Sequence, residues 1–199
     1  MNYAVRSGIA VLLVLAFGGG GVFAAGADDI KLISEMEARK KKIAQAQQLR
    51  LSGLNLKLQD NPKDTAVREQ LILFFLVGFD NIDAAVKLLN DDVDEGIRTY
   101  VSLAAKPPSS LPESACLELG AWYYRVLTKD ALPVEKLPLL KRANTYYERF
   151  LQLHPKKDIQ AARVRSDLQR IRESITKYDE QARQLEDKTI MLHLGKGGL

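Results

Sequence analysis

Few side chains in this 199-residue sequence could do chemistry: one cysteine, two histidines and a cluster of carboxylates. A thiolate nucleophile needs a histidine as its base, yet His154 stands at the end of an expected helix and His193 in a glycine-rich segment. Cys116 shares an apolar helical face with Leu119. We therefore predict a buried core thiol rather than a reactive or intermolecular one.

The carboxylates cluster just before Gly96, at Asp91, Asp92, Asp94 and Glu95. A calcium loop that turned at Gly96 would need an oxygen ligand at position 93, where Val93 offers none. Carboxylates at the start of a helix cap its free N–H groups and complement its dipole. We predict this simpler role, and no metal site.

Enzyme motifs are missing from the sequence. It contains no G-x-S-x-G, no metal-spaced histidine and cysteine set, and no phosphate-binding glycine loop that opens a helix. The Gly-Lys-Gly-Gly run at 195–198 lacks the rest of a nucleotide site. The prediction is a non-catalytic protein without a cofactor.

The first 27 residues have the composition of a secretory signal peptide. Arg6 supplies the positive charge, residues 9–17 form the apolar core, and small residues near 24–27 provide a cleavage site. An uncleaved anchor is the alternative, but a membrane-spanning helix needs about twenty apolar residues. We expect export to the periplasm or the medium, with no membrane span after cleavage.

Hydrophobic residues recur at intervals of three and four along the rest of the chain, the period of helices packed on one side. A long helix is expected at 28–60, with a kink or short break near Ser52-Gly53. A helical-repeat-like domain at 61–190 and a flexible tail at 191–199 follow it. Asn61-Pro62-Lys63-Asp64 ends the first helix and caps the next. The basic run at 39–42 is read as a solvated face, so nucleic-acid binding is not predicted.

Shorter helices are expected at 67–77, 81–90 and 94–105, followed by a proline-serine linker at 106–112. A central pair of antiparallel helices then covers 117–127 and 139–155. Gly120 and Ala143 are small residues at the points where these two helices would approach closely. The fold class is therefore all-α, built from antiparallel helical hairpins with long first and last helices.

The placement of Gly120, Tyr123, Ala143, Tyr147 and Pro155 resembles a tetratricopeptide repeat. The wider stretch 67–171 is similar to a helical module of planctomycete-type bacterial exported proteins, with its turn at Phe79–Ile82, its tryptophan at Trp122 and its tyrosine pair at Tyr146-Tyr147. These resemblances imply a right-handed, tetratricopeptide-like array that is non-catalytic and has no established ligand.

The last helix carries a heptad seam at Ala161, Val164, Leu168, Ile171, Ile175, Tyr178, Ala182 and Leu185. Such a seam packs either against the same chain or against a second chain in a coiled coil. We favour the intramolecular packing. The alternative is a structural subunit that forms a homodimer through residues 161–185.

Charge divides the chain although its net value is only +4. Acidic residues dominate 60–118, and basic residues dominate from 134 onward. Aromatic residues commonly anchor protein interfaces, and the candidates here are Tyr100, Trp122, Tyr124 and Tyr146. Trp122 and Tyr123 are about 100° apart on a regular helix, so at least one of this group should face outward. The predicted function is to bind an unknown protein partner in the cell envelope.

Overall fold

The computed structural model describes residues 27–196, and within that range the chain is helical, with no strand. The α-helices are α1 (Ala27–Asp60), α2 (Thr65–Phe79), α3 (Ile82–Val86), α4 (Glu95–Ala104), α5 (Glu113–Ala121), α6 (Pro133–Leu153) and α7 (Ile159–Lys196). A 3-10 turn covers Pro108–Ser110, and a π-helical segment, Trp122–Leu127, extends α5. The all-α prediction is confirmed. The predicted signal segment, apart from Ala27, lies outside the described residues.

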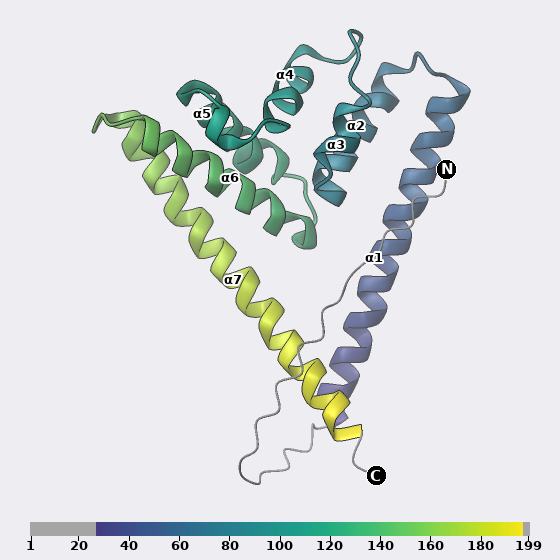
Figure 1. Cartoon of the computed structure of the whole chain (residues 1–199). Coiled ribbons are helices and arrows are strands. Elements are labelled where there is room, and N and C mark those ends of the chain that lie inside the picture. The colour runs from purple at the N-terminus through teal and green to yellow at the C-terminus, as the bar shows by residue number, and fades with distance from the viewer. Residues whose placement is uncertain (1–26, 197–199) are drawn as a thin grey trace.

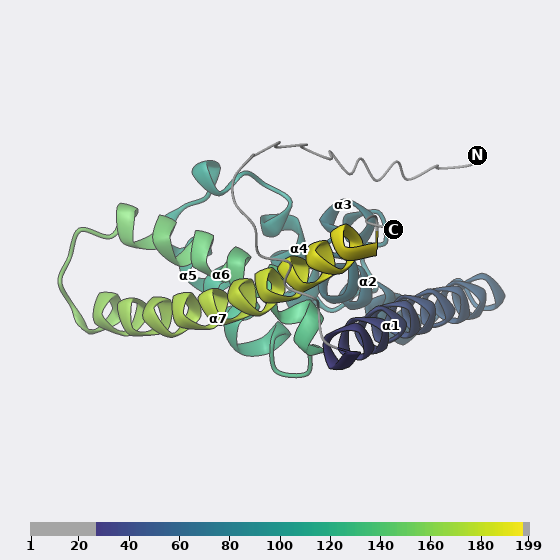
Figure 2. The same cartoon turned by 90° about the horizontal axis from the view of Figure 1, so that it is seen from below.

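The two long helices form the arms of a V (Figure 1). The start of α1 and the end of α7 come together at its point, and α2 to α6 fill the space between the arms. Seen from below, both arms lie on the near side of the shorter helices (Figure 2). α6 is the central element, since it contacts α2, α5 and α7.

Side-chain caps start the short helices where the sequence predicts them. Asp64 accepts a hydrogen bond from the Val67 N–H at 3.0 Å, and Asp94 accepts one from the Ile97 N–H at 3.0 Å. Each carboxylate thereby satisfies an N–H group that has no partner within its helix. The capping role predicted for Asp94 is confirmed.

The main core lies between α6 and its neighbours. Its fully buried residues include Leu119 and Tyr123 before the connector, and Leu139, Ala143 and Phe150 on α6. The heptad seam of α7 joins them: Ala161, Val164, Leu168 and Ile171 are buried, and Ile175 and Tyr178 are half-buried against this core. The seam is therefore packed within the chain as far as Tyr178. The side chains of Ala182 and Leu185 lie outside the described set.

Gly120 marks the closest approach of two helices. A Cβ atom built on Gly120 would overlap the ring of Tyr147, which is only 1% exposed. Any larger residue would push α5 away from α6. The close approach expected from the small residue Gly120 is confirmed, and Ala143 is also fully buried.

Several predicted boundaries are wrong. The helix expected at 81–90 covers only Ile82–Val86, because the N–H groups of Leu88 and Leu89 bond to carbonyls three residues back and form turns instead. α1 has no break at Gly53, because Leu54 and Leu58 pack on α2 beyond it and hold the helix in register. α6 begins at Pro133 rather than at residue 139, because Glu135 caps its start by accepting the Leu132 N–H at 2.8 Å. α7 continues to Lys196, past the predicted start of the tail at 191.

A second, smaller core fastens α1 to the body. Leu54 packs with the α2 residues Val67, Leu71 and Phe74. The Arg50 guanidinium lies 4.9 Å from the centre of the Phe74 ring, a cation–π contact. Polar and apolar contacts thus combine along the second half of α1.

Candidate functional site

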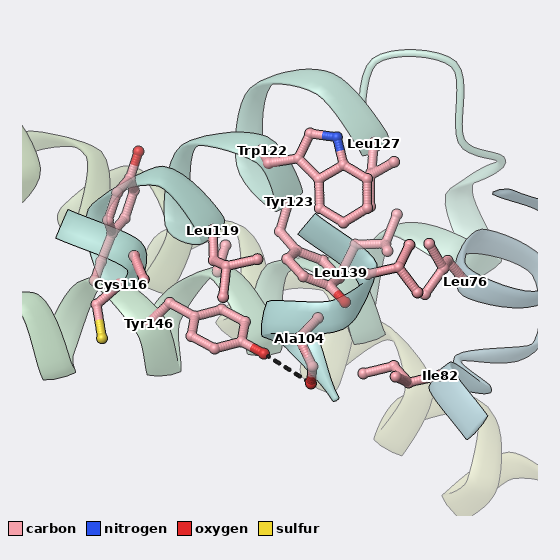
Figure 3. Packing of buried hydrophobic residues seen from close by; sticks show 14 of the residues in the cluster. Leu76, Ile82, Ala104, Cys116, Leu119, Trp122, Tyr123, Leu127, Leu139 and Tyr146 are labelled. Carbon is pink, nitrogen blue, oxygen red and sulfur yellow. Dashed lines mark hydrogen bonds between the residues drawn. The ribbon is translucent and has the colours of Figure 1, made fainter. Parts of the chain in front are cut away.

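The four aromatic residues predicted as partner anchors lie in different environments. Trp122 and Tyr146 are buried, whereas Tyr100 and Tyr124 are half-buried. Tyr100 stacks on Trp122 with ring centres 5.1 Å apart, Trp122 meets Tyr123 edge-on at 5.3 Å, and Tyr123 stacks on Tyr146 at 5.7 Å. Three of the four residues are therefore brought together, as members of a row of rings in the core. Figure 3 shows Trp122, Tyr123 and Tyr146 of this row.

Trp122 and Tyr123 both face inward because aromatic neighbours lie on two sides of the π-helical segment: Tyr100 of α4 stacks on Trp122, and Tyr146 of α6 stacks on Tyr123. The expectation that at least one of the four candidate anchors faces outward rests on Tyr100 and Tyr124, which are half-buried. Trp122 and Tyr146 are too buried to act as surface anchors, so Tyr100 and Tyr124 keep that candidacy.

The turn after α2 is the most unusual backbone feature in the described chain. Asp80 has a left-handed conformation, with φ 48° and ψ 36°, and its N–H donates to the Phe75 carbonyl. Non-glycine residues rarely adopt this conformation, although aspartate tolerates it better than most. The Asp80 carboxylate accepts a hydrogen bond from Nε of Arg142 on α6. An ion pair therefore holds the turn against α6.

Arg142 connects this turn to the aromatic row. Its guanidinium lies 6.0 Å from the centre of the Tyr123 ring. Burial opposes the charge on Arg142, but the hydrogen bond to Asp80 and the nearby Tyr123 outweigh it and raise the Arg142 pKa. For Tyr146 the effect of burial has the opposite sign, because burial disfavours the charged phenolate and so raises the Tyr146 pKa. The Tyr146 hydroxyl donates a hydrogen bond to the Ala104 carbonyl at 3.4 Å (Figure 3). Arg142 therefore stays charged and Tyr146 stays a neutral phenol.

Two hollows flank the ion pair, and both are lined by Asp80 and Arg142. The first has a volume of about 360 Å³ and is otherwise lined by Pro108, Leu137, Pro138, Lys141, Thr145 and Tyr146. The second has a volume of about 440 Å³ and is otherwise lined by Phe79, Asn81, Ile82, Asp83, Ala104 and Ala105. We call the two together the Asp80–Arg142 groove. The lining of the first hollow is mainly apolar, and the lining of the second hollow is mainly polar.

A third and wider hollow, of about 870 Å³, lies between α6 and α7. Leu151 and Leu168 are its apolar residues, and charges of both signs surround them on α7. Arg172 in this hollow is already paired with Glu148 at 2.9 Å. The mixture of charges favours no one class of ligand.

The other candidate reactive groups have structural roles. Cys116 is fully buried, and burial raises its thiol pKa despite the opposing charge of Arg149, as expected for a core thiol. Asp91 pairs with Arg98 at 3.3 Å on the surface. Within residues 27–196 no group of three potential ligands could hold a metal ion, and no helix is long and apolar enough to cross a membrane.

His154, which the sequence predicts only as the end of a helix, connects three helices in what we call the His154 clamp. Its ring nitrogens lie 2.6 Å from Oε1 of Glu113 at the start of α5 and 3.0 Å from Oδ2 of Asp158 before α7. Its ring also stacks on Phe150 of α6 with centres 4.9 Å apart. The hydrogen bond to Glu113 is the main cause of the raised His154 pKa, and the Ala161 N–H is the main cause of the lowered Asp158 pKa.

The clamp predicts a pH-dependent stability. Because the folded pKa of His154 is raised, its contribution is complete below the unfolded pKa of about 6.5 and is lost as pH rises through the folded value. The contribution of Asp158 is present above its unfolded pKa of about 3.9 and is lost as pH falls through its lowered folded value. Urea unfolding followed by circular dichroism from about pH 5 to 9 should show the loss on the alkaline side in the wild type and a flatter profile in His154→Gln. Equal profiles would show that the clamp does not titrate in this range.

Comparison with known proteins adds no relative: the chain matches no protein-family model, no curated protein and no solved structure. The inferences about function therefore rest on the geometry described above. The resemblances to the tetratricopeptide repeat and to the module at 67–171 stay predictions.

Proposed function

We propose that this protein is an exported, non-catalytic helical-repeat protein that holds an extended segment of a partner protein in the Asp80–Arg142 groove. The observation that carries the proposal is the pair of hollows that share one ion pair. A segment long enough to enter both hollows would contact Asp80 and Arg142, which line each of them. That geometry suits a peptide chain better than a compact small molecule.

The lining suits the two parts of a peptide. Main-chain amides of a partner can hydrogen-bond to Asp80 and Arg142, the polar groups at the middle of the groove. Apolar side chains of the partner can pack on Leu137 and Pro138 in the first hollow. Asp83, which is exposed in the second hollow, favours a partner with a cation at that position. Lys141 in the first hollow is already paired with Asp179 at 3.2 Å.

The helical-repeat assignment is supported by the way α5 meets α6. Gly120 lets the two helices touch at the ring of Tyr147, which is the role that a small residue has in a tetratricopeptide hairpin. We interpret α5 with its π-helical extension, followed by α6, as one antiparallel hairpin, and α7 as the helix that covers it. Arrays of such hairpins present surfaces that hold peptide segments.

Export and lack of catalysis belong to the same proposal. The segment 1–27 supports export, and the single cysteine suits a compartment in which a spare thiol is best buried. The raised pKa of Cys116 and the pairing of His154 with two carboxylates both argue against a nucleophile and base pair. Self-association through residues 161–185 remains the alternative, although the seam up to Ile171 is already buried within the chain.

A matched pair of substitutions tests the groove. Thr145 is exposed and lines the first hollow, whereas Thr99 is exposed on α4 and lines none of the three hollows. We expect Thr145→Arg to fill the hollow and to reduce partner capture from an envelope extract by at least about tenfold, roughly 1.4 kcal/mol. Thr99→Arg should capture the same proteins as the wild type.

The measurement is quantitative mass spectrometry of proteins retained by each immobilised variant, with circular dichroism as the check that both are folded. Undiminished capture by Thr145→Arg would remove the groove as the binding site. Equal loss in both variants would point to an effect of added charge rather than to the groove.

A further inference from the structure

α1 carries a second apolar face that the body of the protein does not cover. One face packs Leu51, Leu54 and Leu58 on α2. On the other side of the helix, Leu49 is 76% exposed and Leu56 is 59% exposed. Large apolar residues exposed one heptad apart on the same helix face indicate a contact with another helix.

The full pattern on this outer face is a heptad seam of alternating size. In chain order its positions are Lys42, Ala46, Leu49, Gly53, Leu56 and Asp60, spaced four and three residues in turn. Among residues 27–196, nothing lies within 4 Å of a Cβ atom built on Gly53, so no contact in that part of the chain requires this glycine. Ala46, Lys42 and Asp60 are all exposed.

We propose that the outer face of α1 binds the same face of a second copy of this chain, with the two helices antiparallel. In an antiparallel pair centred at position 51, Leu49 of one copy meets Gly53 of the other, and Leu56 meets Ala46. Lys42 of each copy then meets Asp60 of the other. Every large side chain thus faces a small one, and every cation faces an anion.

The seam selects a second copy because it is complementary to itself. A two-fold contact uses the same surface on both molecules, so each feature must match its own symmetry mate. A parallel pair would bring Lys42 of each copy together and set leucine against leucine. The space beside Ala46 and Gly53 would then stay empty, because each small residue would face another small residue. Alanine and glycine at alternate seam positions let two helix axes come closer than leucine on both sides allows.

This contact is independent of the Asp80–Arg142 groove. It also differs from the coiled coil considered for α7, whose seam is buried against α6 as far as Ile171. α1 lies at the edge of the molecule, with its outer side away from α2 (Figure 1). A second copy can therefore approach without displacing another helix.

Sedimentation equilibrium of the purified protein over a wide concentration range tests the proposal. We expect a monomer–dimer equilibrium whose dissociation constant rises at least about 100-fold in Leu49→Asp, because symmetry places the buried carboxylate in the contact twice. Gln48→Asp adds the same charge on the neighbouring exposed position beside the seam and should leave the constant within about threefold of the wild type, roughly 0.7 kcal/mol. A monomer at all concentrations, or a dimer indifferent to Leu49→Asp, would overturn the proposal.

The register has its own test. Lys42→Asp and Asp60→Lys should each weaken the dimer, and the double variant should restore it, because the pair is reformed with its signs exchanged. A zero-length carbodiimide cross-link between Lys42 and Asp60 can arise only between copies, since these residues are about 27 Å apart along one helix. Absence of this cross-link in the dimer, or failure of the double variant to recover, would rule out the antiparallel register.

Discussion

Replacing Gly120 with alanine is expected to lower the free energy of unfolding by about 2 kcal/mol. The added methyl group would overlap the ring of Tyr147, which is held in the core and cannot move aside. Helix propensity acts in the opposite direction, since alanine usually stabilises a helix by about 0.5–1 kcal/mol relative to glycine. The overlap should dominate because interiors are close-packed and a misfit is transmitted to neighbouring side chains.

Gly53 supplies the matched control, because it is also a helix-interior glycine but has open space around its Cβ position. Gly53→Ala should therefore raise the free energy of unfolding by about 0.5–1 kcal/mol. Urea titrations followed at 222 nm, at a concentration where the chain is monomeric, would measure both variants. Stabilisation of similar size by the two substitutions would contradict the close approach of α5 and α6.

Trp122→Ala is expected to destabilise the fold by about 3–5 kcal/mol. Trp122 is only 8% exposed and lies between Tyr100 and Tyr123, so its loss leaves a cavity and removes two ring contacts. Single domains are commonly stable by about 5–15 kcal/mol, so this loss is a large share of the total. Lost partner capture by a Trp122→Ala variant would therefore reflect a weakened core, because the buried Trp122 cannot itself reach a partner.

Trp122→Phe is the control, because a smaller ring keeps part of the stacking on Tyr100. We expect it to cost about half as much as Trp122→Ala, or about 2 kcal/mol. Far-ultraviolet circular dichroism in urea suits both variants, since each lacks the only tryptophan of the chain. If Trp122→Ala unfolded at the same urea concentration as the wild type, the buried row of rings would be wrong.

Much of the architecture could be predicted because its signals are local. The caps at Asp64 and Asp94 and the apolar period of the α7 seam depend on residues that are close together in sequence. Gly120 is visible as a small residue on an apolar helix, although the ring it makes room for, that of Tyr147, lies on α6. Errors arose where distant packing outweighs a local preference. The glycine at position 53 did not break α1, because the leucines beyond it pack on α2.

The candidate site was harder to predict than the fold. Asp80 and Arg142 are 62 positions apart in sequence, and neither belongs to a motif that would pair them. The sequence signal for the turn at Asp80 is weak: Gly78 and Asn81 flank it, and both residue types are common where a helix ends. The sequence favours the aromatic residues as candidates instead, because an aromatic side chain suits a core and an interface equally well.

By itself, the sequence determined that this protein is helical and where most of its helices start, because helix periodicity and capping act over a few residues. Only the tertiary structure decided which aromatic rings are buried, that Asp80 meets Arg142, and which apolar face of α1 is left open. The physical reason is that burial is a property of the assembled surface: a stripe of leucines records that a helix must pack, but not what it packs against.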